Sequence, residues 1–456
     1  MNSNRRVLYF VVGSVIIYLL LSLIAVSFDV RWKPFNNVNL VSSLFKNNQK
    51  PKPTTAVQVK DSVVTTSVKI NDKPTRDFNL YNQPHLITNF NNDTSQSSLK
   101  DFFRKIYDMR HGNKRKIRIA YFGDSMIEGD LLTQTFRKLL QEEFGGYGVG
   151  FVPITSPISK FRSTAYSDFS NGWEDQNFKT SANSKNLFFS GHLFYGNNDW
   201  AEMRDQTLTD TAGILEKSLL CGYSKAPATI KYYNALFAFS AKEKFNRIVL
   251  ANDKRRNVKI SVSDSLVPIY GVTFESPAGI IVDNFPFRGI TGIELDKIDG
   301  GVLKAISENN PYDLFIFEYG VNLLFRPYDT NFYWYGNVMS SVIKKVKKYF
   351  PGADILLIST ADRAFRYDGE YKSAIGIDSL VNVQANTAFE NGTSFYNTFE
   401  TMGGNNSIIE WANANPSMAR SDYVHPNARG TDTLATYLFQ SMMNDYRKYV
   451  NHLNKE

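Results

Sequence analysis

Residues 117–125 read IRIAYFGDS and place a serine directly after an apolar run. The run predicts a buried β-strand, and Gly123 allows a tight turn at its end. Apolar residues at helical spacing follow as far as Gly145. We therefore expect Ser125 where a strand turns into a helix, with its hydroxyl at the carboxyl end of a sheet and backbone N–H groups that can receive an anion. The alternative is a plain helix N-cap by Asp124 or Ser125.

Further strands and helices alternate along the rest of the chain. Apolar runs that predict buried strands occur at residues 312–319, 354–360 and 394–397, and helical patterns occur at about 99–109, 336–349, 377–390 and 428–450. Such alternation is typical of a parallel sheet that helices cover on both faces. The expected fold class is therefore α/β.

A second motif with chemical potential precedes the last helical pattern, where residues 422–427 read DYVHPN. Asp422 and His425 stand three apart, so the carboxylate can hold one imidazole nitrogen while the other serves as a base for a serine. Of the five histidines, His111 and His192 lack such a partner in the sequence. The alternative is a capped turn with a solvated imidazole.

An asparagine follows the predicted strand at 312–319, in the sequence Gly320-Val321-Asn322. A side-chain amide at the carboxyl end of a strand can donate a hydrogen bond to a developing oxyanion. An asparagine that only caps the loop is the alternative.

Three short motifs thus occur in order: Gly123-Asp124-Ser125, Gly320-x-Asn322 and Asp422-x-x-His425. The ordered set resembles the SGNH (GDSL-type) hydrolase family over roughly residues 97–150 and 280–450. The resemblance implies a flavodoxin-like three-layer α/β/α fold with a parallel sheet. It also implies ester hydrolysis by a serine nucleophile, without a metal or an organic cofactor.

The same resemblance implies roles for single residues. Ser125 would be the nucleophile, His425 its general base, and Asp422 the residue that orients His425. Met126 replaces the usual leucine and Val321 the frequent threonine. Neither departure removes a residue that the chemistry needs.

The oxyanion hole of the family needs a further glycine, whose N–H would act beside the Ser125 N–H and the Asn322 side chain. Residues 283–292, DNFPFRGITG, resemble the block that supplies this glycine. We assign the role to Gly289, with Gly292 as the alternative.

Residues 151–281 separate the first two motifs and predict an inserted β-sandwich. Residues 258–264 alternate strictly between apolar and polar, and 267–274 form a further strand candidate. This layout resembles bacterial peptidoglycan O-acetylesterases, whose insert is similar to a carbohydrate-binding module. Trp173 and Trp200 could stack on sugar rings or lie buried. The alternative is a stabilising cap without a ligand.

The N-terminal part predicts a membrane anchor. Residues 7–28 carry no charge and would span about 30 Å as a helix, and two arginines precede them. A cleaved signal peptide ending near residues 25–27 is the alternative. Polar residues and prolines over 29–96 predict a flexible linker, whose last part, 77–90, is apolar enough to pack on the domain. The expected domains are 1–28 (cytoplasmic tip and anchor), 29–96 (linker), 97–150 with 282–456 (hydrolase) and 151–281 (insert).

Composition excludes several classes of protein. The chain has 456 residues, of which 43% are hydrophobic, so it is not wholly disordered. Its single cysteine, Cys221, excludes an intramolecular disulfide framework, a four-thiolate zinc site and a cysteine-liganded iron–sulfur cluster. The net charge of +8 is spread without a long Lys/Arg block or a nucleic-acid-binding motif, so no nucleic acid is expected as a partner.

The expected function is a serine esterase that removes O-acetyl groups from a cell-envelope glycan, peptidoglycan or another polysaccharide, through an acyl-enzyme. It would be a single-pass protein of the inner (cytoplasmic) membrane with its catalytic domain on the periplasmic or extracellular side. One alternative is an O-acetyltransferase of the same fold that works with a multi-pass membrane acyltransferase. The other is a non-catalytic glycan-binding protein of the envelope.

Overall fold

The computed structural model describes residues 3–27, 81–90, 95–181, 186–208, 213–263 and 267–455. The chain divides into two compact units, residues 1–71 and 72–456. In the first unit the structure describes one helix, α1 (Ser3–Ser27). Among the described residues, no helix has a stretch that is both long and apolar enough to cross a membrane. The expected anchor stays a prediction. Most of the expected linker at 29–96 lies outside the described residues.

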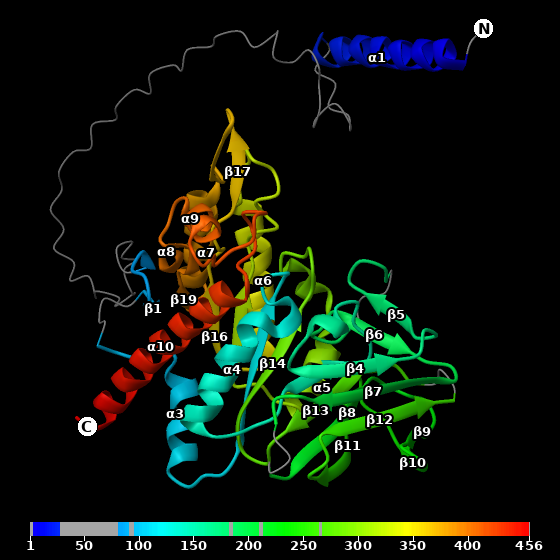
Figure 1. The fold of residues 1–456 in the computed structure, drawn as a ribbon, viewed down its shortest axis with the longest axis vertical. Helices are drawn as coiled ribbons and strands as arrows, with labels where there is room; N and C mark the ends of the chain where they lie inside the picture. Colours follow the sequence, from blue (N-terminus) through cyan, green and yellow to red (C-terminus); the bar gives the residue numbers. More distant parts are fainter. Residues whose placement is uncertain are drawn as a thin grey trace, which may run out of the picture. The chain divides into compact units, whose positions relative to one another are not determined.

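The second unit is built on a six-stranded sheet with the order β1-β19-β16-β15-β2-β14 (Figure 1). Its strands are β1 (Ile87–Thr88), β2 (Lys116–Gly123), β14 (Gly279–Pro286), β15 (Leu314–Glu318), β16 (Asp354–Ile358) and β19 (Ser394–Tyr396). All pair in parallel except β1, which is antiparallel to β19. Numbered along the chain from β2, the five parallel strands lie in the order 2-1-3-4-5, which is the flavodoxin-like arrangement. β1 belongs to the end of the expected linker, and Tyr81 and Phe90 beside it are buried.

Helices cover both faces of this sheet. On one face, α3 (Lys100–Arg110), α4 (Leu131–Phe144) and α10 (Ala428–Leu453) pack Phe103, Phe136 and Leu438 against Ile117 and Ile119 of β2. The other face carries α5 (Gly300–Asn309), α6 (Tyr333–Tyr349) and α7 (Ile377–Glu390). Alternate residues of β2 point to opposite faces; Ala120 and Phe122 therefore join the second core. The expected three-layer α/β/α fold is confirmed.

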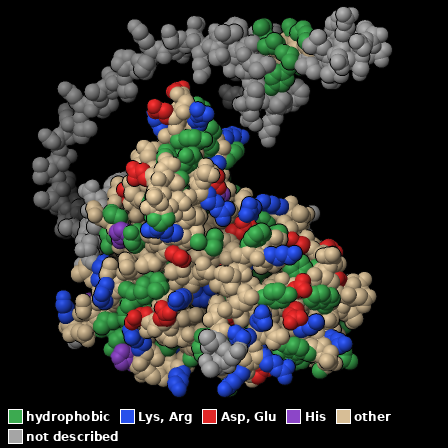
Figure 2. Space-filling model, in the orientation of Figure 1, with side chains coloured by type: hydrophobic (Ala, Val, Ile, Leu, Met, Phe, Trp, Pro, Cys, Tyr) green, Lys and Arg blue, Asp and Glu red, His purple; other side chains and the backbone are tan. Residues whose placement is uncertain are grey.

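Shorter elements complete the hydrolase domain. They are the 3-10 turns η2 (Glu128–Asp130) and η5 (Ile293–Lys297), the hairpin β17 (Ala364–Tyr367) with β18 (Glu370–Ser373), and the helices α8 (Thr398–Met402) and α9 (Ser407–Asn413). On the face shown in Figure 2, basic and acidic side chains are interspersed and do not gather in one basic patch.

The insert is a sandwich of two antiparallel sheets, as expected. One sheet has the order β10-β9-β12-β7-β4 and the other β11-β8-β13-β6-β5, with β3 paired to β13. The strands are β3 (Gly150–Pro153), β4 (Ala165–Phe169), β5 (Glu174–Asn177), β6 (His192–Tyr195), β7 (Asp199–Asp205), β8 (Leu215–Cys221), β9 (Ala228–Tyr232), β10 (Ala235–Phe239), β11 (Asn246–Asp253), β12 (Asn257–Val262) and β13 (Ile269–Glu275), with the 3-10 turn η3 (Ser159–Phe161) between β3 and β4. Met203 and Ile260 of one sheet meet Leu219 and Val272 of the other in a separate apolar core.

The insert is held tightly to the hydrolase domain. Phe188 of the insert packs edge-on against Phe285 of β14 at a ring distance of 5.5 Å, and Phe189 meets Phe315 of β15 at 5.9 Å. All four rings belong to the core beneath α5, α6 and α7. Because one hydrophobic core includes residues of both parts, the insert has a fixed position beside the end of the parallel sheet.

Candidate active site

Ser125 lies on a tight turn directly after β2. A Cβ at Gly123 would lie only 3.0 Å from the Glu318 carbonyl oxygen of β15, so a glycine is needed for this close approach. The helix does not follow at once: η2 intervenes, and α4 begins at Leu131 with Asp130 at its N-cap. The alternative of a helix cap by Asp124 or Ser125 is therefore wrong.

Ser125 heads a chain of two hydrogen bonds. Its Oγ lies 2.9 Å from His425 Nε2, and His425 Nδ1 lies 2.8 Å from Asp422 Oδ2. A carboxylate can only accept, so the imidazole proton belongs on Nδ1, and Nε2 is left to accept the serine proton. Ser125 and His425 are 300 positions apart, and the structure brings them together with Asp422. The arrangement is that of a Ser-His-Asp triad, which can generate a nucleophilic alkoxide.

The loop that carries Asp422 and His425 is held by its backbone. Asp422 Oδ1 accepts hydrogen bonds from the N–H groups of Val424 at 2.9 Å and His425 at 3.0 Å. Burial raises the pKa of Asp422, but these N–H groups and the His425 ring outweigh burial and lower the pKa overall. The cap of α10 is Asn427, whose side chain accepts from the Gly430 N–H. Asp422 therefore caps the turn of this loop, as the alternative expected, but the imidazole also lies between Asp422 and Ser125.

The backbone N–H groups of Ser125 and Gly289 have no hydrogen-bond acceptor among the described residues. The Phe287 N–H donates to the Gly123 carbonyl at 3.0 Å, which holds the segment that leads to Gly289 beside the nucleophile turn. Gly289 has φ +76°, a conformation that side chains rarely adopt. Gly292, the alternative, lies against the Tyr319 ring, where a Cβ would come within 2.5 Å of a ring carbon. Packing alone therefore explains a glycine at 292, and the oxyanion role of Gly289 stays a prediction.

Asn322 lies behind the nucleophile turn, where its amide nitrogen has two acceptors. Nδ2 donates to Asp124 Oδ2 and to the Ile290 carbonyl, both at 2.9 Å. These bonds tie the loop that contains Gly289 to the turn that contains Ser125. Both amide N–H groups are engaged in this way, so the expected contact of Asn322 with an oxyanion requires one of the two bonds to be shared. That role stays a prediction, and the structure shows a positioning role.

Two carboxyl groups are buried beneath the nucleophile. Burial, with a further contribution from Glu318, raises the pKa of Asp124 to about 7 against the opposing hydrogen bonds from the Met126 N–H and Asn322. Burial likewise raises the pKa of Glu318 to about 7, although its hydrogen bond from the Tyr121 hydroxyl at 2.6 Å acts in the opposite direction. Near neutral pH, Asp124 and Glu318 are therefore partly protonated.

Ser125, Asp422 and His425 line a cavity of about 180 Å³. The sequence did not identify three charged residues of its lining, Glu128, Arg288 and Arg420. Arg288 pairs with Glu128 across two segments 160 positions apart, a contact that no local pattern indicates. The one signal in the sequence for Arg288 is its position directly before Gly289, the residue assigned to the oxyanion hole. In the part of the chain that the structure describes, no cluster of three or more His, Cys, Asp or Glu side chains could hold a metal ion.

The insert contains a second histidine with a carboxylate partner, which corrects the expectation for His192. His192 Nδ1 lies 2.8 Å from Asp175 Oδ1, and these residues belong to the paired strands β6 and β5. Trp173 is buried, and its Nε1 donates to the Trp200 carbonyl at 3.0 Å, so it packs in the sandwich. The Lys259 ammonium lies 5.3 Å from the Trp200 ring centroid and occupies one face of this ring.

The sheet order and the site together define an SGNH-type hydrolase fold with an inserted β-sandwich. Ser125 and Asn322 follow β2 and β15, the neighbouring strands between which the strand order reverses, where α/β folds bind ligands. The chain is similar to a solved structure of a peptidoglycan O-acetylesterase, with a TM-score of 0.67 and 20% identity over 79% of this chain and 99% of the other. At 20% identity, this similarity shows that the two chains share a fold, and it shows nothing further.

Two further solved structures share less with this chain. A family two carbohydrate esterase from Cellvibrio japonicus matches with a TM-score of 0.26 and 10% identity over 62% of this chain and 99% of the other. Est24, a carbohydrate acetylesterase from Sinorhizobium meliloti, matches with a TM-score of 0.26 and 15% identity over 36% of this chain and 79% of the other. No family model and no curated protein matches the sequence.

Proposed function

We propose that this protein is a serine esterase that removes O-acetyl groups from a cell-envelope glycan, with peptidoglycan as the first candidate. The observation that carries the proposal is the unbroken hydrogen-bond chain from Ser125 Oγ through His425 to Asp422. The small catalytic cavity of about 180 Å³ suits a short acyl group. The fold shared with a peptidoglycan O-acetylesterase supports the choice of glycan.

The geometry supports a two-step reaction. Ser125 Oγ attacks the ester carbonyl carbon while His425 Nε2 takes the hydroxyl proton, and the Ser125 and Gly289 N–H groups stabilise the oxyanion. His425 then returns the proton to the sugar oxygen, which leaves as a hydroxyl and produces acetyl-Ser125. Water attacks the acyl-enzyme with His425 again as base, and acetate is released. This chain's own side chains supply every proton transfer.

Acetate release tests the proposal directly. Wild-type protein is incubated with O-acetylated peptidoglycan, and acetate is measured over time. Ser125→Ala lowers the rate by a factor on the order of 10⁵ to 10⁶, because the residue that forms the acyl-enzyme is lost. Ser307→Ala is the matched control, since Ser307 lies on α5 and, within the described part of the chain, its hydroxyl bonds the Lys304 carbonyl alone. Release by Ser125→Ala at the wild-type rate contradicts the proposal.

The proposal includes attachment to the inner membrane through residues 7–28, with the catalytic domain outside the cytoplasm. It rests on the uncharged apolar sequence of these residues. The expected result is that the full chain sediments with membranes and that a variant lacking 7–28 does not. A full chain found in the soluble fraction contradicts this part.

A multi-pass acyltransferase partner would be required only if a sugar hydroxyl, and not water, receives the acetyl group from Ser125. The two outcomes share the acyl-enzyme and differ in the acceptor. Adding deacetylated glycan as an acceptor separates them. An esterase continues to release acetate, whereas a transferase produces acetylated glycan at the expense of acetate.

A further inference from the structure

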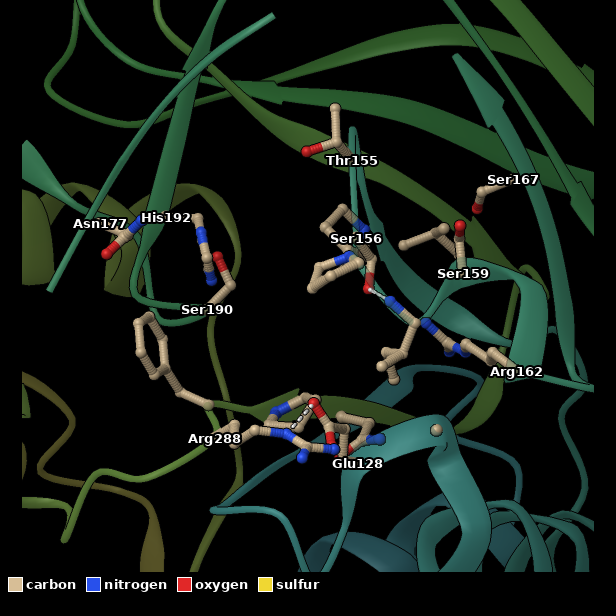
Figure 3. A pocket seen from close by; sticks show the side chains of 18 of the residues that line it. Glu128, Thr155, Ser156, Ser159, Arg162, Ser167, Asn177, Ser190, His192 and Arg288 are labelled. Atoms are coloured by element: carbon tan, nitrogen blue, oxygen red, sulfur yellow. Dashed lines mark hydrogen bonds and ion pairs between the residues drawn. The ribbon is translucent and has the colours of Figure 1, made fainter. Parts of the chain in front are cut away.

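A second cavity, of about 360 Å³, lies where the β-sandwich meets the hydrolase domain (Figure 3). Ser190, His192 and Arg162 line it from the insert, and Asn284 and Phe287 line it from the hydrolase domain. Its volume falls within the range of about 300 to 1,000 Å³ that is usual for small-molecule sites. It is larger than the catalytic cavity of about 180 Å³.

The two cavities are neighbours. Glu128 and Arg288 line both of them, and the ion pair between these residues forms part of the shared wall. In Figure 3 this pair stands below the cavity, apart from Ser190 and His192. The second cavity therefore adjoins the cavity in which an ester would meet Ser125.

Two buried oxygen atoms on residues that line this cavity have no hydrogen-bond partner among the described residues, Ser190 Oγ and Asn284 Oδ1. Ser190 is 6% exposed and Asn284 is 4% exposed. Folded proteins satisfy most buried polar groups, because an unsatisfied one loses the hydrogen bonds it made to water. A hydroxyl-bearing or amide-bearing ligand would supply the missing partners.

Most charged side chains around the cavity are already in ion pairs, and Lys179, which has none among the described residues, donates to the Arg288 carbonyl. His192 contacts Asp175 at 2.8 Å, Arg162 contacts Asp130 at 3.4 Å, and Arg288 pairs with Glu128. The lining also contains apolar groups, among them Phe287, Pro153 and Ile158. Orphaned polar atoms, paired charges and apolar walls together favour a neutral ligand with both hydroxyl or amide groups and apolar faces, as in an N-acetylated sugar ring.

The walls of the cavity are fixed before any ligand arrives. The insert segment that contains Ser190 follows Phe188 and Phe189, which are buried in the core of the hydrolase domain. Asp130, which lines the cavity, also holds Arg137 of α4 at 2.8 Å and accepts from Thr164 of the insert at 2.5 Å. A preformed site loses little conformational entropy on binding.

We propose that this second cavity is a sugar subsite that binds the neutral ring next to the acetylated unit of the same glycan chain. The proposal rests on the proposed esterase function and adds to it that the enzyme recognises a polymer and not an isolated acetylated sugar. The insert then contributes to substrate selection through Ser190 and its neighbours.

The test compares two substrates that carry the same ester. One is 6-O-acetylated N-acetylmuramic acid, and the other is a peptidoglycan tetrasaccharide with that ester on one unit. We measure kcat/KM for both with the full chain and take the ratio of tetrasaccharide to monosaccharide. The wild-type ratio is expected to be about ten or more, because the adjoining ring gains contacts that the monosaccharide lacks. A wild-type ratio near one overturns the proposal.

Ser190→Leu fills part of the cavity and is expected to lower this ratio to near one, mainly through KM for the tetrasaccharide. Ser261→Leu is the matched control, since Ser261 lies on β12 away from the cavity and should keep the wild-type ratio. Ser190→Ala removes only the hydroxyl and is expected to lower the ratio about two- to tenfold, so it serves where Ser190→Leu does not fold. A wild-type ratio in both Ser190 variants overturns the subsite. If the wild type releases acetate from neither sugar, the proposed function itself is wrong.

Discussion

The protein contains two histidine–aspartate pairs of nearly equal geometry in two neighbouring cavities. His425 Nδ1 lies 2.8 Å from Asp422, and His192 Nδ1 lies 2.8 Å from Asp175. The first pair continues to Ser125 Oγ at 2.9 Å. The second has a serine nearby in sequence, but Ser190 Oγ makes no hydrogen bond among the described residues. The His192 ring instead stacks on Phe287 at a centroid distance of 4.8 Å.

The comparison teaches that an oriented imidazole is not by itself a catalytic base. His425 contacts a hydroxyl that stands at the end of a strand of the parallel sheet, and the N–H of the same serine has no acceptor among the described residues. In the proposed reaction this hydroxyl is the nucleophile and this N–H helps to stabilise the oxyanion. His192 lies in a strand of the sandwich, packed on aromatic rings, where it forms a wall of the second cavity. The same pair of side chains thus contacts a serine hydroxyl in one place and packs against aromatic rings in the other.

The largest expected contrast comes from removing each imidazole. His425→Ala should lower hydrolysis of a chromogenic acetate ester by a factor on the order of 10⁵ to 10⁶, since Ser125 loses its base. His192→Ala should lower it by less than about tenfold, because His192 contacts no reacting atom. Steady-state rates on the same ester measure both. Comparable losses in the two variants would remove the distinction between the pairs.

Removing the carboxylates gives a smaller contrast of the same kind. Asp422→Asn is expected to lower kcat by about 10²- to 10⁴-fold, because the amide can favour the wrong imidazole tautomer at His425. Asp175→Asn changes a pair that holds no nucleophile, so kcat on a chromogenic acetate ester should stay within a few-fold of wild type. An Asp422→Asn variant with a wild-type kcat would show that the exposed carboxylate contributes nothing to orientation.

A buried charge network lies beside the second cavity. Asp130 is fully buried and pairs with Arg137 and Arg162. Asp130→Asn removes the carboxylate that both cations contact and should lower the free energy of unfolding by about 3–5 kcal/mol. Asp101→Asn, which breaks an exposed contact with Arg104, should cost less than about 1 kcal/mol. Denaturant titration compares the two, and equal losses would show that the network is not stabilising.

The smallest effect concerns the buried carboxyl beneath the catalytic site. Glu318 has a pKa raised to about 7, so from its ordinary value up to pH 7 the folded chain keeps a proton that the unfolded chain has released. The contribution of Glu318 to the free energy of unfolding therefore falls as pH rises from its ordinary pKa to about 7, and it is constant at higher pH. Glu318→Gln should reduce the loss of stability between pH 5 and pH 8 by about 1–3 kcal/mol.

Glu143→Gln, at an exposed position paired with Arg110, is the control for this pH series and should reproduce the wild-type curve. Denaturation midpoints at several pH values measure the effect. A Glu318→Gln curve that runs parallel to wild type would show that Glu318 is ionised in the folded protein.

Local patterns predicted the frame of this fold well. β2, α7 and β16 appear where apolar runs and helical spacing indicated them, because buried parallel strands and amphipathic helices leave strong periodic signals. β1, with two residues, is too short for such a signal. Most strands of the sandwich were not predicted either, since short edge strands such as β5 (EDQN) are largely polar.

The candidate site likewise contains residues that the sequence predicted and contacts that it could not predict. Ser125, Asp422 and His425 stand in short motifs whose order along the chain is informative, and the structure brings these three together. Contacts between distant segments could not be predicted, and the pairing of His192 with Asp175 through β5 and β6 is the clearest case. The engagement of Asn322 by Asp124 and Ile290 also depends on three separate loops, which no spacing in the sequence relates.

The central claim is that Ser125 Oγ is the atom that becomes acylated. The most direct measurement is to trap the full chain with an acetyl ester at short reaction times, digest it and map the added mass. The account predicts one acetyl group on the peptide that contains Ser125, and none in Ser125→Ala. An acetyl group on another serine, or turnover of the ester with no covalent adduct on Ser125, would contradict it.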